Sequence, residues 1–203
     1  MKKFKRLTAL ALALVMVLGL TTGAGAAGAK YSSWFAPYYK EMQELGILPS
    51  SFTSGDLTAT ITRGEMCELA VVAFEKATGN VIDELERTDY FTDTTDKNIL
   101  KAYEYGIVSG YPDGSFRPDQ KITRAETVTM INRVLDRVPA KESRLLSRSI
   151  MLTFPDNNPG DWYYIAIQEA SNSHEYQRSV YETTGDEMWT KLIDNVDWTK
   201  LEK

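Results

Sequence analysis

The chain has 203 residues, of which 25% are charged, and its net charge is −5. An acidic chain does not attract nucleic acid or anionic lipid through its overall field, which excludes those partners as a general mode of binding. Its one cysteine, Cys67, excludes an intramolecular disulfide and falls on the apolar face of a predicted helix, where a thiol acts as a small hydrophobe.

The N-terminus has the pattern of a secretory signal peptide. Four basic residues within the first six precede an apolar run over 7–20, and two A-x-A sites follow at 24–26 and 27–29. A membrane anchor is the alternative, but this run is shorter than the roughly 20 apolar residues of a spanning helix. We therefore predict a cleaved signal peptide over 1–29, a secreted chain and no membrane contact after cleavage.

Two segments of the chain repeat one another at a distance of about 60 residues. The first contains ELGIL at 44–48 and ITRGE at 61–65, and the second contains EYGIV at 104–108 and ITRAE at 122–126. Each segment predicts a helix, a loop and a second helix. The first helix ends at a glycine, Gly46 or Gly106, that is followed at once by isoleucine.

The second helix of each repeat begins at a threonine with a glutamate three residues later, which is the capping-box pattern. Both helices then carry apolar residues at the spacing of one buried stripe. The residues of these two stripes are Cys67, Ala70 and Phe74 in the first repeat, and Val128, Ile131 and Leu135 in the second.

A third unit begins at Phe154 and keeps only part of the pattern. Trp162 and Ile167 predict a first helix, but no glycine stop and no T-R-x-E follow. Thr184-x-x-Glu187 predicts the cap of a last helix that contains Trp189, Leu192 and Ile193. The expected repeats are thus 30–79, 90–138 and 153–203.

The stretch from Phe91 to Leu135 closely resembles the S-layer homology motif of bacterial surface proteins, through GIVSGYPDGSFRP and ITRAE. The first repeat shares the helices and ITRGE but has PSSF at 49–52 where the motif has S-G-Y-P-D-G, and the third shares only its first helix. Helix pairs of this size need neighbours to bury their stripes. We therefore expect an all-α fold of three helix-loop-helix repeats, which the resemblance implies to be a pseudo-threefold bundle.

The resemblance also implies a function at the bacterial cell surface. Proteins with this motif attach non-covalently to the cell wall by binding an anionic secondary cell-wall polysaccharide, often pyruvylated, in grooves between repeats. The motif arginine meets the carboxylate, and without a third T-R-x-E we expect at most two working grooves. The residues that match the binding motif are Arg63, Arg124, Gly110, Tyr111, Asp113, Trp34, Thr62 and Thr123.

Several of these residues also have a purely structural interpretation. Thr62 and Thr123 cap helices, and Trp34 suits a core. Arg63 and Arg124 stand at the first helical position, where the helix dipole disfavours a cation. Either a bound anion or an ion pair with an acidic residue of the adjoining repeat would reverse that penalty.

Other functions have weaker support in the sequence. No G-x-S-x-G, H-E-x-x-H or Cys/His pairing occurs, so we predict no enzyme, no cofactor and no metal, although a catalytic pair of carboxylates stays open. The alternative to glycan binding is a docking module that binds another surface protein.

Overall fold

The computed structural model describes residues 23–24, 28–137, 139–178 and 187–194. Most of the predicted signal peptide, together with Thr184, therefore lies outside the described residues. The chain divides into two compact units, Met1–Thr123 and Arg124–Lys203. Among the described helices, none has the length and apolar character needed to cross a membrane.

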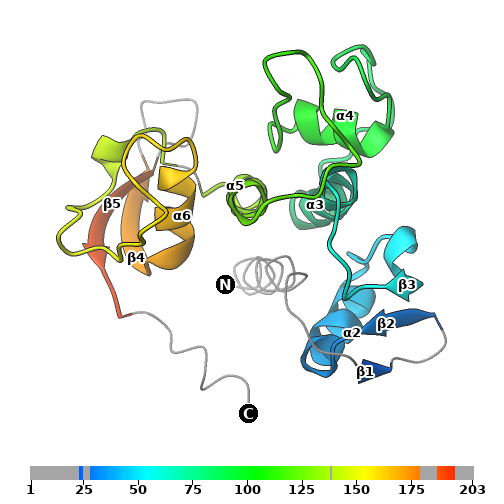
Figure 1. Ribbon diagram of the computed structural model, residues 1–203, viewed down its shortest axis with the longest axis horizontal. Coiled ribbons are helices and arrows are strands. Elements are labelled where there is room, and N and C mark those ends of the chain that lie inside the picture. The colour runs from blue at the N-terminus through cyan, green and yellow to red at the C-terminus, as the bar shows by residue number, and fades with distance from the viewer. Residues whose placement is uncertain (1–22, 25–27, 138, 179–186, 195–203) are drawn as a thin grey trace. The chain divides into compact units, whose positions relative to one another are not determined.

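The first unit contains both helices of the first expected repeat and the first helix of the second (Figure 1). Its helices are α2 (Ala36–Leu45), α3 (Arg63–Thr78) and α4 (Lys97–Glu104), with the 3₁₀ turns η2 (Ser33–Phe35) and η3 (Ser50–Phe52). Three short strands accompany them, β1 (Gly23–Ala24), β2 (Ala29–Tyr31) and β3 (Gly55–Asp56).

The predicted end of α2 at Gly46 and the predicted start of α3 at Thr62 are confirmed. Gly46 closes α2 in the left-handed conformation at φ 66°, and the amide of Ile47 donates to the Met42 carbonyl at 3.0 Å. At the start of α3, the Glu65 amide donates to Thr62 Oγ1 at 3.2 Å, and the Thr62 amide donates to Glu65 Oε2 at 2.7 Å. This reciprocal pair is the capping box.

The repeats are joined where α3 packs on α4. Lys101 and the hydroxyl of Tyr105, from the second repeat, each contact the same carboxylate oxygen of Glu75 on α3 at 2.9 Å. Cys67, earlier on α3, is fully buried, and burial raises the pKa of its thiol to about 12. Cys67 therefore behaves as a core hydrophobe.

The all-α prediction is wrong, because both units contain β-structure. In the first unit β2 pairs with β1 antiparallel and with β3 parallel, and Lys30 Nζ lies 2.6 Å from the Asp56 carboxylate across the parallel pair. These strands are two or three residues long. They formed part of what we expected to be signal peptide and loop, and they are too short to leave a period in the sequence.

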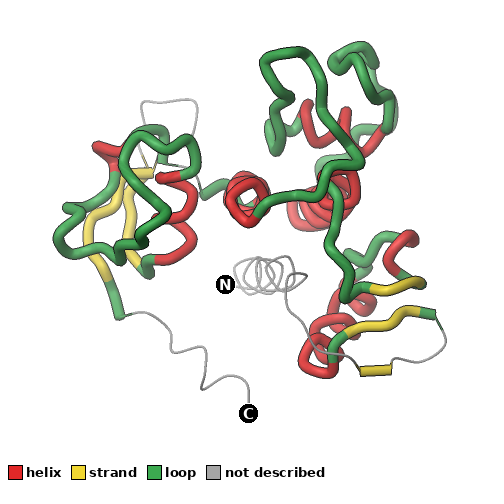
Figure 2. The backbone as a smooth tube through the Cα atoms, in the orientation of Figure 1, coloured by secondary structure: helices red, strands yellow, loops and turns green. Residues whose placement is uncertain are grey.

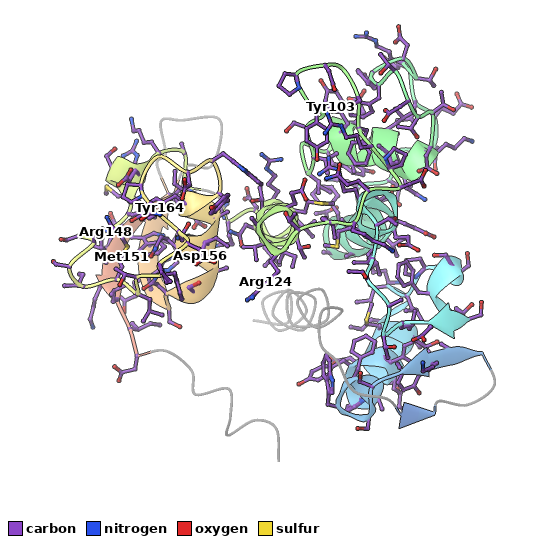
Figure 3. All side chains as sticks on the ribbon, viewed as in Figure 1. Tyr103, Arg124, Arg148, Met151, Asp156 and Tyr164 are labelled. Atoms are coloured by element: carbon purple, nitrogen blue, oxygen red, sulfur yellow. The ribbon has the colours of Figure 1, made fainter. Side chains whose placement is uncertain are left out.

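The second unit departs further from the expected repeat. After α5 (Arg124–Val134), the turn η4 (Glu142–Arg144) and α6 (Tyr164–Ser171), the chain forms two antiparallel strands, β4 (His174–Arg178) and β5 (Glu187–Leu192). Figures 1 and 2 show this pair beside α6, and Tyr164 starts that helix at 2% exposure (Figure 3).

The predicted last helix is therefore a strand. Trp189, Leu192 and Ile193 fit a helical spacing, but Glu187 and Trp189 are buried whereas Met188 and Thr190 are exposed, which is the two-residue period of a strand. The chain leaves α6 in an extended conformation at Asn172, where the first two expected repeats have a glycine stop. Tyr, Trp and Thr in the two segments favour strands as well.

A buried charge network attaches the strands to the helices. The guanidinium of Arg137, just after α5, lies 2.7 Å from Glu169 on α6 and 2.9 Å from Glu187 on β5. Arg178 on β4 adds a second cation 3.1 Å from Glu187. Trp189 donates its indole N–H to Glu169 at 2.9 Å. Two arginines thus neutralise two carboxylates whose side chains are at most 3% exposed.

His174 completes this network with contacts at both ring nitrogens. Its Nε2 lies 2.8 Å from Arg137 Nη2, and because a guanidinium can only donate, this nitrogen accepts. The other ring nitrogen, Nδ1, then carries the proton and donates to the Asn172 carbonyl at 2.6 Å. The imidazole also stacks on Trp189 with 3.8 Å between ring centres.

Arg137→Ala should destabilise the second unit by about 3 kcal/mol, because it leaves two buried carboxylates without their shared cation. Urea denaturation measured by circular dichroism tests this, with the exposed Lys141→Ala as the matched loss of one charge. Equal denaturation midpoints for the two variants would contradict the role assigned to Arg137.

Candidate functional site

The loop over 109–120 covers the N-terminus of α3. The backbone carbonyl of Gln120 accepts from the Arg63 amide, and that of Pro118 accepts from the Gly64 amide, both at 2.9 Å. With Thr62 bonded to the Glu65 amide, the first three helix amides all have protein partners. A ligand at this site therefore meets side chains and not the amides of the helix.

Arg63 is held beneath this loop. It is 6% exposed, and its Nε donates to the Phe116 carbonyl at 3.0 Å. The guanidinium carbon lies 4.6 Å from the centre of the Phe116 ring and 4.8 Å from that of Tyr111. These two aromatic faces offset the unfavourable position of a cation at the start of a helix.

Tyr111 also receives a second arginine. The guanidinium of Arg117 lies 4.0 Å from the same ring centre, and the tyrosine hydroxyl accepts from Gln120 Nε2 at 3.2 Å. Two positive charges therefore lie over one half-buried aromatic ring. Arg117 is the more accessible of the two, because 46% of its side chain is exposed.

Two aspartates fix the shape of the loop. Asp113 accepts from the amide and hydroxyl of Ser115 and from Arg117, and these hydrogen bonds hold the pKa of its carboxyl well below the ordinary value. Asp93 accepts from the amides of Phe116 and Arg117 at 2.8 and 2.7 Å. Burial alone would raise the pKa of Asp93, but the amide hydrogen bonds outweigh it and lower the pKa.

Gly110 is required by close packing. A Cβ at this position would lie 2.5 Å from the Phe91 ring and 2.9 Å from the Ser115 carbonyl oxygen. Phe91 itself cannot easily move, because it is 8% exposed and packs against Phe116 and Tyr103.

The structure brings five of the eight predicted residues together at the start of α3: Thr62, Arg63, Gly110, Tyr111 and Asp113. Trp34 lies in η2, half-buried, with its ring 5.7 Å from that of Phe35. Thr123 is exposed at the end of the first unit. Arg124 is the first residue of α5 in the second unit, and its exposed side chain projects from that helix (Figure 3).

Sequence reasoning missed Arg117, Phe116, Asp93 and Gln120 as parts of the site. All four lie within or next to the motif stretch, and the F-x-D at 91–93 is echoed in the third unit. Arg117 adopts a left-handed backbone at φ 61°, which is uncommon for a residue other than glycine. The amino-acid composition of the loop does not predict that conformation.

The second unit contains a group of possible metal ligands in its charge network. Glu169, His174 and Glu187 offer ligand atoms within 4.8 Å of one another. Arg137, however, contacts all three and supplies the positive charge that two buried carboxylates require. The arrangement is explained by that guanidinium without an ion.

Comparison with known proteins places this loop in a family. Residues 91–128 match the S-layer homology domain. This match confirms the resemblance predicted for the second repeat. The match covers neither the first nor the third expected repeat, which stay predictions. No solved structure matches the chain.

Curated relatives share longer parts of the chain. It is 29% identical over 172 residues to the cellulosome-anchoring protein of Acetivibrio thermocellus, covering 81% of this chain and 35% of that protein. It is 26% identical over 174 residues to the surface layer protein of Brevibacillus choshinensis, covering 78% and 14%. Over 78 residues it is 38% identical to cell surface glycoprotein 1 of A. thermocellus, covering 38% and 3%.

The chain thus spans about a third or less of the length of each of these relatives. The family and the surface proteins among the relatives confirm the predicted cell-surface location.

Gly110→Ala should destabilise the first unit by about 1–3 kcal/mol, because the added methyl group collides with a backbone carbonyl and a packed ring. Thermal unfolding measures the loss, and Ser109→Ala, at the exposed neighbouring position, serves as the control. An unchanged midpoint for Gly110→Ala would show that the loop can move away from Phe91.

The stabilising effect of Asp93 should depend on pH. Because folding lowers the pKa of Asp93, its contribution is present above the unfolded pKa of about 4 and is lost as the pH falls through the folded value. The difference in melting temperature between the wild type and Asp93→Asn should therefore be largest near pH 7 and shrink below about pH 4. A difference that is constant down to pH 2 would contradict this.

Proposed function

We propose that this chain attaches non-covalently to the bacterial cell surface, and that the loop over 109–120 binds an anionic cell-wall polysaccharide. The observation that carries the proposal is the pair of guanidinium groups, Arg63 and Arg117, over the ring of Tyr111. The S-layer homology match and the anchoring and surface-layer relatives support the same conclusion.

The chemistry of the loop suits an acidic sugar. A tyrosine ring and hydroxyl offer an apolar face and a polar edge to a pyranose, and a guanidinium binds a carboxylate with two parallel hydrogen bonds. A pyruvate ketal or another acidic substituent on the polysaccharide supplies such a carboxylate.

Arg117 is the residue proposed to contact the carboxylate. It is paired with Asp113 at 2.9 Å, with about half of each side chain exposed. An exposed ion pair of this kind is worth little, so a ligand carboxylate can replace Asp113 at low cost. Arg63, which is buried, supports the Tyr111 ring from within and adds positive charge.

Arg124 is proposed as a second contact in the second unit. It stands at the same motif position as Arg63 but is exposed. Because its side chain is not packed into a core, it can be removed with little effect on the fold.

The loop carboxylates do not favour catalysis. Asp93 and Asp113 both have lowered pKa values, because hydrogen bonds hold them ionised. A general acid requires the opposite shift, towards the operating pH. We therefore propose a role in binding, without a chemical step at this site.

Docking of another surface protein is the second candidate, and one observation favours it. Several apolar side chains of the second unit are 40–57% exposed, namely Ile150, Leu152, Met188 and Ile193. Exposed apolar residues of this kind occur at sites of protein association.

Binding of the whole chain to purified wall sacculi tests the proposal. Arg117→Gln and Arg124→Ala should each weaken binding about tenfold or more, since each removes a charged hydrogen bond worth about 1.5–3 kcal/mol. Arg87→Ala, which removes an exposed arginine of the first unit, should bind like the wild type.

Acid extraction of the polysaccharide from the sacculi provides the second arm. Extraction should abolish binding of the wild type, and added salt should weaken it. Binding that survives extraction and both substitutions would overturn the proposal in favour of protein docking. Circular dichroism of each variant separates lost binding from lost folding.

A further inference from the structure

Two segments that join the helices of the expected repeats carry opposite charges. The first connector, over 80–89, has four acidic residues and one arginine, which gives a net charge of −3. The second connector, over 139–152, has three basic residues and one glutamate, which gives a net charge of +2. Both lie between α-helices, the first in the first unit and the second in the second unit.

The first connector presents acidic side chains beside an apolar one. Asp83, Glu84 and Glu86 are exposed, and among the described residues none of these three carboxylates has a hydrogen-bond or ion-pair partner. The neighbouring Val81 is 58% exposed. The backbone between them is held in place, because the amide next to Val81, that of residue 82, donates to the hydroxyl of Tyr105 at 2.9 Å.

The second connector combines basic side chains with exposed apolar ones. Lys141 and Arg148 are exposed, and Ile150 and Leu152 are 57% and 44% exposed. Its end is fixed to the second unit, because the Leu152 amide donates to Asn172 Oδ1 at 2.8 Å.

Strand β5 extends the surface of the second connector. Arg144, in the turn η4, contacts Met188 on β5 with 3.9 Å between its Nη1 and the thioether sulfur, and Met188 is 40% exposed. Burial raises the pKa of the Tyr164 hydroxyl, and Glu142 and Arg148 also act on it, so the turn and Arg148 both lie near this one hydroxyl. Exposed apolar side chains bordered by charged ones are typical of sites of protein association.

The charge of this basic surface favours a partner that is acidic and partly apolar, and the first connector of another copy of the chain has both properties. Complementary charges guide two surfaces together and fix their register. The apolar side chains, Val81 on one copy and Ile150, Leu152 and Met188 on the other, gain from being removed from water.

We propose that copies of this chain associate with one another, the first connector of one copy binding the second connector and Met188 of the next. Because the two contacting surfaces differ, the assembly either closes into a ring or extends as a row of copies. The proposal goes beyond attachment to the cell wall and does not rest on it, since neither connector contains a residue proposed to bind glycan.

Sedimentation velocity of the secreted chain over a series of concentrations tests the association. We expect oligomers that increase with concentration and dissociate in high salt. The double substitution Asp83→Lys with Glu84→Lys should raise the dissociation constant about a hundredfold or more, because it places like charges opposite one another. Lys141→Glu with Arg148→Glu should have the same effect for the same reason.

A mixture of the two charge-reversed chains is the decisive sample. Each chain alone has two connectors of the same sign and should stay monomeric, whereas in the mixture each supplies the charge that the other lacks. The mixture should therefore associate again.

Two further variants control for the change in net charge. Glu41→Lys with Glu44→Lys, and Lys97→Glu with Lys191→Glu, reverse the same number of charges at exposed positions outside the connectors. Both should associate like the wild type. Circular dichroism confirms that each variant is folded, which the exposed positions of all the substitutions favour.

Three results would overturn the proposal: a wild-type chain that is monomeric at every concentration, association that persists in both charge-reversed chains, and a mixture that remains monomeric. The first would leave the basic surface to a partner of another kind. Binding to sacculi is measured separately. A chain that associates but does not bind sacculi contradicts only the proposed function, and the opposite result contradicts only the association.

Discussion

The start of a buried helix leaves backbone amides without partners, and the first unit depends on how this is resolved at α3. The solution is not local. The carbonyls of Pro118 and Gln120, more than fifty residues further along the chain, accept from the amides of Gly64 and Arg63, respectively. One set of hydrogen bonds thereby caps the start of a helix of the first repeat, shapes the loop of the second repeat, and holds Arg63 against two aromatic rings.

The second unit also contains buried polar groups that need partners, and there side chains supply them. Glu187 on β5 and Glu169 on α6 both have buried carboxylates. Buried carboxylates are destabilising unless cations pair with them. Arg137, after α5, contacts both glutamates, and Arg178, on β4, contacts Glu187. The change from a helix to a β-hairpin is thus accompanied by a change in what holds the repeat together, from apolar stripes to a charge network.

Local features could be predicted from the sequence, because the residues that determine them are neighbours. The capping box at Thr62 and the glycine stops at Gly46 and Gly106 each require only four or five residues, and the structure contains them.

The hairpin was missed because residues 187–193 fit a helical period and a strand period equally, and what decides between them is the burial of Glu187 against Arg137. The partners of Arg63 were missed for a similar reason, since no spacing links it to Phe116, 53 residues away. Arg117 was not predicted as a site residue, because its role depends on a left-handed backbone conformation that the residue types of the motif do not predict.

The burial of Cys67 affects both its oxidation outside the cell and its use in labelling experiments. The thiol is the single one in the chain and is both fully buried and protonated. Thiolate, the nucleophilic form, is therefore essentially absent, and the oxidising exterior of a cell has little chance to link two copies through it. The same inertness makes the chain a clean background for labelling. A cysteine introduced on the surface would be the one site that a maleimide probe could reach, so that each unit could carry a dye or spin label without removing the native residue.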